Sequence, residues 1–466
     1  MMRKLTLLAC IAVFMTGCPR AVKYQVPQSP VPAKWTAGSD SPAAVAGAPA
    51  AAGVKWQEFF ADTRLRSVID LTLANNRDLR IASLNIEKVQ NMYRIQRVAQ
   101  YPVVGVAASV SSTWIPKDMG SSGNAHSVQE YSVSFGTASW ELDLFGRVRS
   151  LKEAALQQYL ATEQVRSATQ ISLVSAVANS YLALTADREN LKLARATLET
   201  QQASYDLIRS IRDLGMTSDL EVSQAQSQVD AAKVEIAIYS SQLPLDENAL
   251  NLLVGSPVPA DLLPDDLGKV ASFKDISAGL SSDVLLGRPD ILAAEHQLRA
   301  AHANIGAARA AFFPRISLTT GVGLVSGDLT DLFKWGARTW AFAPQIIFPI
   351  FDYGARKAGL NIAGVDRDIA VAEYEKAIQS AFREVNDALS LRKTLVAQQD
   401  ALQALLSTLE ETYRLSEARY KGGIDSYLSV LVAQRSLYSV QQQLVGIRLA
   451  RQSNLVALYK VLGGGA

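Results

Sequence analysis

The sequence contains two copies of one unit, and this internal repeat limits the possible folds more than any other feature. Residues 78–102 match residues 290–314 at an offset of 212, and both segments end at a proline. From about Gly146 the offset is 208, and residues 215–226 share Gly, Ser, Leu, Val, Ala and Gln with residues 423–434 at identical spacing. Because self-similarity at a fixed offset indicates a duplicated structural unit, we expect two similar halves, residues 56–280 and 281–466.

Each half contains one very long stretch with apolar positions at helical spacing. The pattern predicts helices over residues 63–100, 147–212, 217–255, 286–312, 355–420 and 426–462. A continuous helix over 355–420 would be roughly 100 Å long at about 1.5 Å per residue, which is too long for a compact globule. Pro244 falls inside the third predicted helix and is expected to kink or interrupt it.

Between the predicted helices the period changes to strict alternation, which predicts two β-hairpins at about 103–143 and 315–352. Val104, Val106 and Val110 share one face, whereas small and hydroxyl residues share the other. Runs of about 10 residues can cross a bilayer when tilted. We therefore expect a mainly α fold with a β part. Four strands would leave open edges in lipid, so closure needs more than one copy of the chain. Since bacterial barrels have at least about 8 strands, a dimer is the smallest possibility and a trimer would give twelve, and arithmetic alone does not choose between them.

The N-terminus reads as an export signal. Arg3-Lys4, the apolar run from Leu5 to Met15 and the small residues before Cys18 predict a signal peptide over 1–17. Cys18 follows a small pair as in a lipobox, which predicts acylation of its thiol; the alternative is ordinary cleavage nearby that leaves a free thiol. The Pro- and Ala-rich residues 18–55 are expected to form an extended leader.

Composition excludes several other classes of protein. Removing Arg3 and Lys4 changes the basic count from 46 to 46 − 2 = 44, against 44 acidic residues, so nucleic-acid binding has no electrostatic basis. The chain has three histidines; His296 and His302 do not share a helix face, so no metal site is expected. No phosphate-binding or nucleophile motif is present, and we expect neither a cofactor nor an enzyme.

Several segments together resemble the TolC-like outer-membrane efflux proteins, in their lipoprotein branch. They are Trp56–Phe60, Asn76–Leu79, Asp143–Arg147, Arg288–Ile291, Ile305–Arg309, Phe313-Pro314 and Leu458–Gly465. The resemblance implies a homotrimer, with a twelve-stranded outer-membrane barrel continuous with a twelve-helix periplasmic barrel. It implies a passive exit duct for small toxic molecules. A periplasmic adaptor would join this duct to an inner-membrane transporter of the resistance-nodulation-division type.

The resemblance also assigns roles to the turns between the long helices. In the family, short Gly-centred turns form the periplasmic tip and dock the adaptor. The matching residues are Leu214, Gly215, Met216, Gly422, Gly423 and Ile424. The alternative is turn chemistry alone, since glycine permits the positive φ that such turns need.

The family narrows its closed aperture with residues around the second tip. Tyr420, Leu428 and Arg435 match that pattern, but Val432 replaces an aspartate. A ring of valines would not attract cations as a carboxylate ring does, although Leu428 would still narrow the opening. For Tyr420 and Arg435, packing or solvation is the alternative to gating.

Two other functions remain open from the sequence. A TolC-like duct for type I protein secretion would share the architecture. A coiled-coil surface scaffold would explain the helices but not the amphipathic hairpins.

Overall fold

The computed structural model describes residues 24–35, 54–119, 124–264, 266–270, 273 and 282–464. The chain forms two compact units, and each unit combines segments of both repeats. The sheet unit contains the described parts of Met1–Gln28, Ile86–Thr162 and Ala294–Tyr374. The helical unit contains those of Ser29–Asn85, Glu163–Ala293 and Glu375–Ala466. The predicted signal peptide and Cys18 lie outside the described residues.

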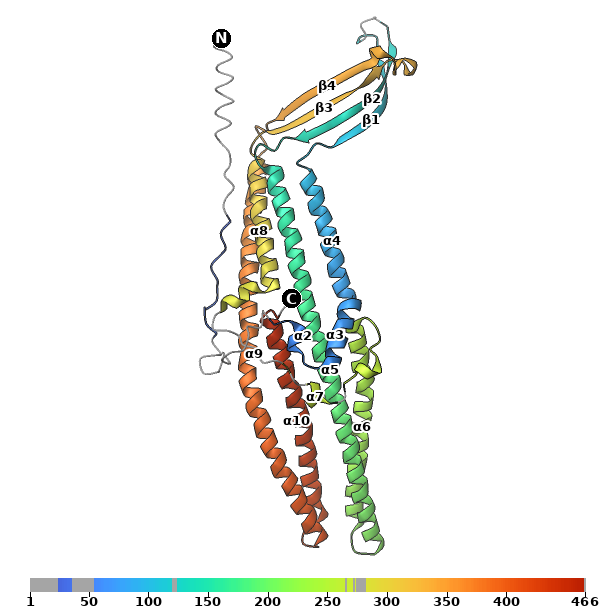
Figure 1. Ribbon diagram of the computed structural model, residues 1–466, viewed down its shortest axis with the longest axis vertical. Coiled ribbons are helices and arrows are strands. Elements are labelled where there is room, and N and C mark those ends of the chain that lie inside the picture. The colour runs from blue at the N-terminus through green and yellow to red at the C-terminus, as the bar shows by residue number, and fades with distance from the viewer. Residues whose placement is uncertain are drawn as a thin grey trace. The chain divides into compact units, whose positions relative to one another are not determined.

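The sheet unit holds one four-stranded antiparallel sheet, which confirms both hairpins and the mainly α fold with a β part (Figure 1). Its strands are β1 (Val104–Ile115), β2 (His126–Glu141), β3 (Arg315–Ser326) and β4 (Arg338–Ile347), in the order β1-β2-β3-β4. The central pair, β2 with β3, joins the two hairpins. Strands β1 and β4 are therefore the two edges of the sheet.

The two faces of the sheet differ in chemistry, as the alternation predicts. One cross-strand row pairs Val106 with Phe135, Phe135 with Val322 and Val322 with Trp340, so one face is apolar. The other face carries glycine, alanine and serine, and Ser109 Oγ lies 2.7 Å from Ser132 Oγ across β1 and β2. The sheet is thus apolar on one side and small or polar on the other.

Glycines on the polar face allow a close approach of the central strands. A Cβ at Gly136 would lie 2.1 Å from the carbonyl oxygen of Thr320, so no other residue fits there without displacing the backbone. The register of β2 shifts between Thr137 and Trp140, where Ser139 has a φ of 54°. This irregularity interrupts the alternation of side chains along β2.

Four helices join the sheet at one end, and only their nearer parts belong to the sheet unit. Helix α4 (Arg77–Val98) precedes β1, α5 (Arg147–Asp213) follows β2, α8 (Pro289–Ala310) precedes β3 and α9 (Ala355–Lys421) follows β4. Both α5 and α9 are 67 residues long. At about 1.5 Å per residue each is roughly 100 Å long, which confirms the prediction from their unbroken helical pattern.

The helical unit contains the remaining parts of these helices together with α2 (Trp56–Phe59), α3 (Thr63–Asn75), α6 (Asp219–Val254) and α10 (Tyr427–Val461). Short elements η3 (Ala260–Leu262), α7 (Leu267–Val270) and η4 (Ser282–Gly287) connect them. Its aromatic core stacks Phe59 on Tyr459 with ring centroids 4.2 Å apart, and the Tyr459 hydroxyl donates to the carbonyl of Val54 at 3.0 Å.

Two local expectations differ from the structure. The single helix expected over 63–100 is broken at Asn76, whose Oδ1 accepts from the amide of Leu79 (2.9 Å) while its Nδ2 donates to the carbonyl of Leu253 (2.7 Å). Asparagine can cap a helix in this way even where the sequence has no proline or glycine to mark the boundary. In contrast, α6 runs through the exposed Pro244, so an interruption there is wrong, and a kink at this proline stays a prediction.

Among the described residues, no helix combines the length and apolar character needed to cross a membrane. Within the same ranges, no three His, Cys, Asp or Glu side chains gather closely enough to hold a metal ion.

Candidate tip and aperture residues

The two predicted tips are the turns between α5 and α6 and between α9 and α10. In the first, the amide of Gly215 donates to the carbonyl of Arg212 (2.8 Å) and that of Met216 donates to Ile211 (3.1 Å). In the second, Gly423 donates to Tyr420 and Ile424 to Arg419, each at 2.9 Å. Both patterns are Schellman motifs, which satisfy the last helix carbonyls.

The glycine at each turn is required by backbone conformation alone. Gly215 has a φ of 73° and Gly423 a φ of 69°, and a Cβ at either would meet nothing within 4 Å. Gly422 does not have a positive φ. The alternative reading, turn chemistry, therefore accounts fully for Gly215 and Gly423, but it does not account for their apolar neighbours.

Those neighbours expose large apolar side chains. Leu214 is 72% exposed, Met216 69% and Ile424 66%. Leu220, at the start of α6, is 66% exposed as well. Several exposed apolar side chains clustered at one turn are unusual, because the hydration of apolar surface is unfavourable. These tips have the character of a contact surface.

The predicted aperture residues do not all share one location. Leu428 (54% exposed) and Val432 (58% exposed) lie one turn apart on the exposed face of α10, and Arg435 continues that face. Tyr420 instead packs inward, with its ring 5.4 Å from that of Tyr427. The structure thus brings three of the four predicted residues onto one surface, whereas Tyr420 is half-buried against Tyr427.

A buried cluster joins the two hairpins near their tips. It contains Ile208 of α5, Ala225 of α6 and Tyr427, Val430 and Leu431 of α10, each 5% exposed or less. Burial raises the pKa of Tyr427 to about 12, and the neighbouring Tyr420, Tyr413 and Glu221 add to the shift. This cluster was not predicted from the sequence. The match of Tyr205 to Tyr413 across the repeat was the available signal.

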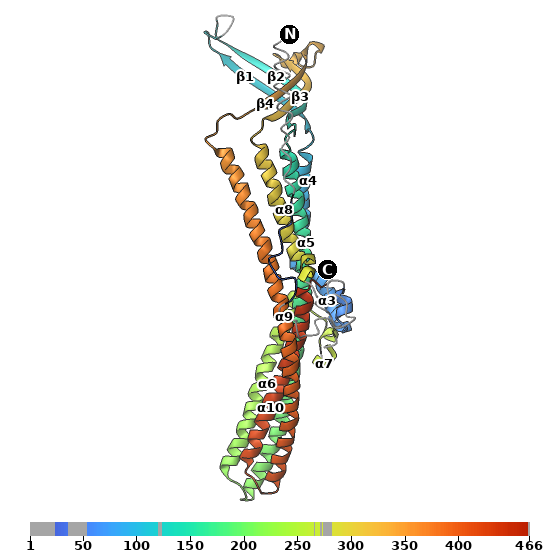
Figure 2. The same cartoon turned by 90° about the vertical axis from the view of Figure 1, so that its left-hand side faces the viewer.

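A second contact between the hairpins lies further along α6 and α10, which run side by side (Figure 2). The Nε2 of Gln442 donates to Tyr438 (3.1 Å) within α10 and to Tyr239 and Glu235 of α6, both at 3.3 Å. Nearby, burial and a hydrogen bond with Asp246 raise the pKa of Asp187 to about 6. This carboxyl pair was not predicted from the sequence either.

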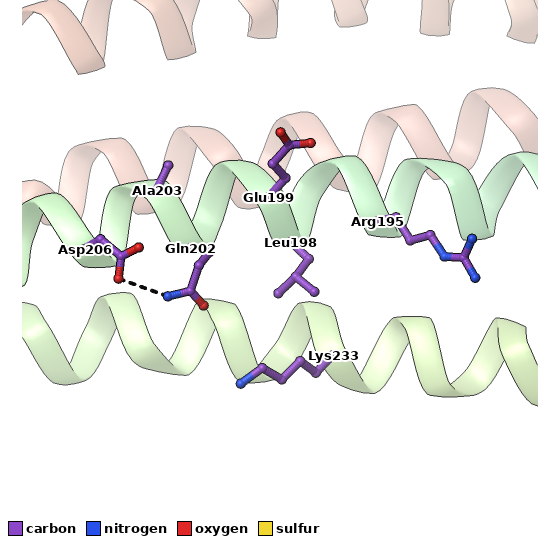
Figure 3. A pocket seen from close by; sticks show the side chains of 7 residues that line it. All are labelled: Arg195, Leu198, Glu199, Gln202, Ala203, Asp206 and Lys233. Atoms are coloured by element: carbon purple, nitrogen blue, oxygen red, sulfur yellow. Dashed lines mark hydrogen bonds between the residues drawn. The ribbon is translucent and has the colours of Figure 1, made fainter.

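The first hairpin also has a groove between α5 and α6, with a volume of about 490 Å³ (Figure 3). Its lining carries charges of both signs: Arg195 and Lys233 are basic, and Glu199 and Asp206 are acidic. Gln202 donates to Asp206 at 3.1 Å across one turn of α5. The groove lacks the convergent donor set of a catalytic or metal site.

Comparison with known proteins agrees with this architecture. The model of the family described as "Outer membrane efflux protein" matches residues 68–256 and 280–464, one segment in each repeat. Two Pseudomonas putida proteins are each 45% identical over 465 residues, covering 100% of this chain and 96% of theirs. Their names are "Antibiotic efflux pump outer membrane protein ArpC" and "Toluene efflux pump outer membrane protein TtgC".

The fold is also found in a solved channel. The open state of the Neisseria gonorrhoeae MtrE outer membrane channel superposes with a TM-score of 0.88 at 39% identity, covering 96% of this chain and 98% of that one. The resemblance drawn from the motifs is thereby confirmed. Since both repeats match and the relatives align almost from end to end, this chain belongs to the outer membrane efflux protein family and is the outer-membrane channel of an efflux pump.

Proposed function

We propose that three copies of this chain close into one tube that crosses the outer membrane and extends through the periplasm. The observation that carries the proposal is a four-stranded sheet with two free edges and two unlike faces. Joining β4 of each copy to β1 of the next gives twelve strands without an edge, which satisfies every backbone group in lipid. The apolar face would meet lipid, and the small, polar face would line water.

In this assembly the two turns form the periplasmic tip and dock a periplasmic adaptor, which connects to a resistance-nodulation-division transporter. The exposed Leu214, Met216 and Ile424 support this role, because an adaptor would cover apolar surface that no other described residue of the chain covers. The duct itself catalyses no reaction and needs no cofactor. An acyl group on Cys18, which lies outside the described residues, would anchor each copy to the membrane.

The cargo we propose is a set of small toxic molecules, including antibiotics and aromatic solvents. The printed names of the two Pseudomonas putida relatives support this class, since one is named for antibiotics and the other for toluene. Selection among such molecules would lie mainly with the inner-membrane transporter, so the duct needs only a wide lumen.

Reconstitution tests the proposal directly. The purified chain should migrate as a heat-modifiable trimer and conduct ions in planar bilayers, and a strain lacking it should accumulate a fluorescent drug. A coiled-coil scaffold would show neither trimer nor conductance. A duct for protein secretion would conduct, but its loss would retain a protein in the cell and leave drug accumulation unchanged.

The aperture is tested by the same measurement. If Tyr420 and Arg435 hold the tip closed, replacing both by alanine should raise conductance, and an unchanged conductance contradicts their assignment. Val432→Asp should raise cation selectivity by placing three carboxylates at the constriction. Arg209→Ala serves as the control, because it removes an exposed cation from α5 and leaves the face of Leu428 intact.

A further inference from the structure

The end of the sheet that joins the helices carries an excess of cations. We define the basic collar as residues 94–103, 141–152, 305–315 and 347–357, all of which belong to the sheet unit. Its cations are Arg94, Arg97, Arg147, Arg149, Lys152, Arg309, Arg315, Arg356 and Lys357, and its acids are Glu141, Asp143 and Asp352. The net charge is 9 − 3 = +6, although the whole chain carries only +2.

The opposite end of the sheet shows no such excess. Its two connections, residues 116–125 and 327–337, contain two lysines and three aspartates, which gives 2 − 3 = −1. The pairing of Val104 with Thr137 and of Arg315 with Ile347 places the four collar segments at one end (Figure 1). The excess of cations is therefore a property of one end of the sheet.

The few acids of the collar are already paired. Glu141 accepts from Arg147 (2.7 Å) and Arg315 (3.2 Å), and Asp143 lies 3.2 Å from Arg149. Asp352 lies 2.6 Å from Arg356. The remaining five cations of the collar have no carboxylate partner among the described residues. They are Arg94, Arg97, Lys152, Arg309 and Lys357. Five positive charges are thus available to an external anion.

The collar also exposes large apolar and aromatic side chains. Tyr353 is 92% exposed, Ile350 87%, Phe351 74% and Tyr101 66%. Aromatic rings beside basic side chains are typical of the interface between a membrane and water, where the ring sits among headgroups and the cation meets phosphate. A water-exposed surface alone would not favour this combination.

A cavity of about 320 Å³ lies within the collar. Its lining includes Arg147, Arg315 and Arg356, the acids Glu141 and Asp143, and the stacked rings of Phe145 and Phe313, whose centroids are 4.8 Å apart. A guanidinium has five donors, so the ion pairs to Glu141 and Asp352 leave further N–H groups for an anion. The lining thus has three cations against two acids, and the spare N–H groups of the cations lie beside an apolar wall.

We propose that the basic collar binds anionic glycerophospholipids of the leaflet on the helical side of the sheet. The inference rests on the proposed function, because the strands must lie in a bilayer for the collar to lie at headgroup level. Phosphate diesters with a negatively charged headgroup, such as phosphatidylglycerol, match the unpaired cations. The zwitterionic phosphatidylcholine offers no net charge. Lipid A would sit in the opposite leaflet, at the end with a charge of −1.

Lipid titration of the full chain in neutral detergent, followed by native mass spectrometry, tests the proposal. The wild type should bind phosphatidylglycerol in preference to phosphatidylcholine. A variant with Arg94→Gln, Arg97→Gln, Arg309→Gln and Lys357→Gln should bind phosphatidylglycerol roughly 600-fold more weakly, since each of the four cations near an anionic surface contributes about fivefold. The control carries Lys192→Gln, Arg195→Gln, Arg209→Gln and Lys233→Gln in the helical unit and should bind like the wild type.

Three results would overturn the proposal: equal binding of the two lipids by the wild type, retained phosphatidylglycerol binding by the collar variant, or tighter binding of lipid A that the collar variant leaves unchanged. Conductance and trimer formation separate this inference from the proposed function. A collar variant that conducts normally but loses phosphatidylglycerol supports the collar. A wild type that neither assembles nor conducts contradicts the duct, whatever its lipid preference.

Discussion

The two long helix hairpins, α5 with α6 and α9 with α10, have the same backbone geometry but differ in their charged side chains. Their long helices have the same length, and both turns end in a Schellman motif with glycine at positive φ. At the offset of 208, however, Arg212 and Asp219 correspond to Tyr420 and Tyr427. The first pair is an exposed ion pair with Nη1 and Oδ1 3.0 Å apart, and the second is a packed pair of rings.

The same divergence recurs far from the tips. Asp187 and Asp246 of the first hairpin correspond to Leu395 and Asn454 of the second, at the same offset. Leu395 is buried, and Asn454 donates to the carbonyl of Ala388 at 3.1 Å. The two repeats thus have the same helix lengths and glycine turns, whereas the side chains that join the two helices of each hairpin differ. The first hairpin should respond to pH and salt, and the second should depend on packing.

The largest expected difference concerns the residues just after each turn. Tyr427 is 2% exposed, whereas its counterpart Asp219 has a side chain that is 86% exposed. Tyr427→Ala should destabilise the second tip by about 3 kcal/mol or more, because it leaves a cavity among buried neighbours. Asp219→Ala should cost less than about 0.5 kcal/mol. Hydrogen exchange of α10 amides measures the first effect as a roughly hundredfold faster rate.

The conservative variant Tyr427→Phe separates packing from the hydroxyl group. It keeps the ring in the cluster with Ile208 and Val430, so exchange should stay within about tenfold of the wild type. If Tyr427→Ala and Asp219→Ala had equal effects, the two tips would not differ in the way that their burial indicates.

The buried carboxyl pair gives the next largest effect. The pKa of Asp187 is raised to about 6 in the folded chain, mainly by burial, above the ordinary value of about 3.9. The proton on the pair therefore stabilises the fold fully below about pH 4, and this contribution is lost as pH rises to about 6. Asp187→Asn should stabilise the first hairpin by about 1 to 2 kcal/mol at neutral pH.

Thermal unfolding between about pH 4 and about pH 8 measures this contribution. The wild type should lose stability across that range, and Asp187→Asn should flatten the loss. Asp206→Asn is the matched control, since it removes an exposed carboxylate from the same helix and should leave the slope intact. A slope that persists in Asp187→Asn would mean that other groups carry the pH dependence.

The shared turn geometry predicts equal effects in the two hairpins. Gly215→Ala and Gly423→Ala should each cost about 1 kcal/mol, because both force an L side chain to a positive φ without any clash. Gly422→Ala should cost less, since its φ is not positive. Exchange rates at the two tips report the losses. Clearly unequal losses at Gly215 and Gly423 would show that the turns are not one conserved device.

Much of this comparison could be predicted from the sequence. Helical periodicity over dozens of residues gave α5, α6, α9 and α10 to within two residues, because repeated apolar spacing averages out local exceptions. Alternation gave all four strands. The break at Asn76 could not be predicted, because one side-chain amide makes it by bonding to both the backbone of Leu79 and that of the distant Leu253.

The candidate site was predicted less completely than the fold. The tips follow from glycine spacing, and the apolar residues beside them are exposed, but the sequence could not indicate that Tyr420 packs inward while Leu428 faces out. That distinction depends on the pairing of two hairpins far apart in sequence, through Ile208 and Tyr427. The basic collar could not be predicted from the sequence, because its cations come from four separate segments. Only the register of the sheet shows that these segments lie at the same end.

The smallest expected effect is the response of the first tip to salt. The ion pair between Arg212 and Asp219 is exposed, so it should contribute only about 0.3 kcal/mol. Raising sodium chloride from about 0.05 M to about 0.5 M shortens the screening length to below about 5 Å and should remove most of that contribution. Exchange at the first tip should then become less than about twofold faster, and Arg212→Gln should abolish the response.

The second tip lacks a charge at Tyr420 and Tyr427, but Arg419 and Asp425 pair at 2.6 Å beside it. Hydrogen exchange at the second tip should therefore be measured at both salt concentrations in the Arg419→Gln variant. A salt response that remains there would contradict the conclusion that packing stabilises the second tip.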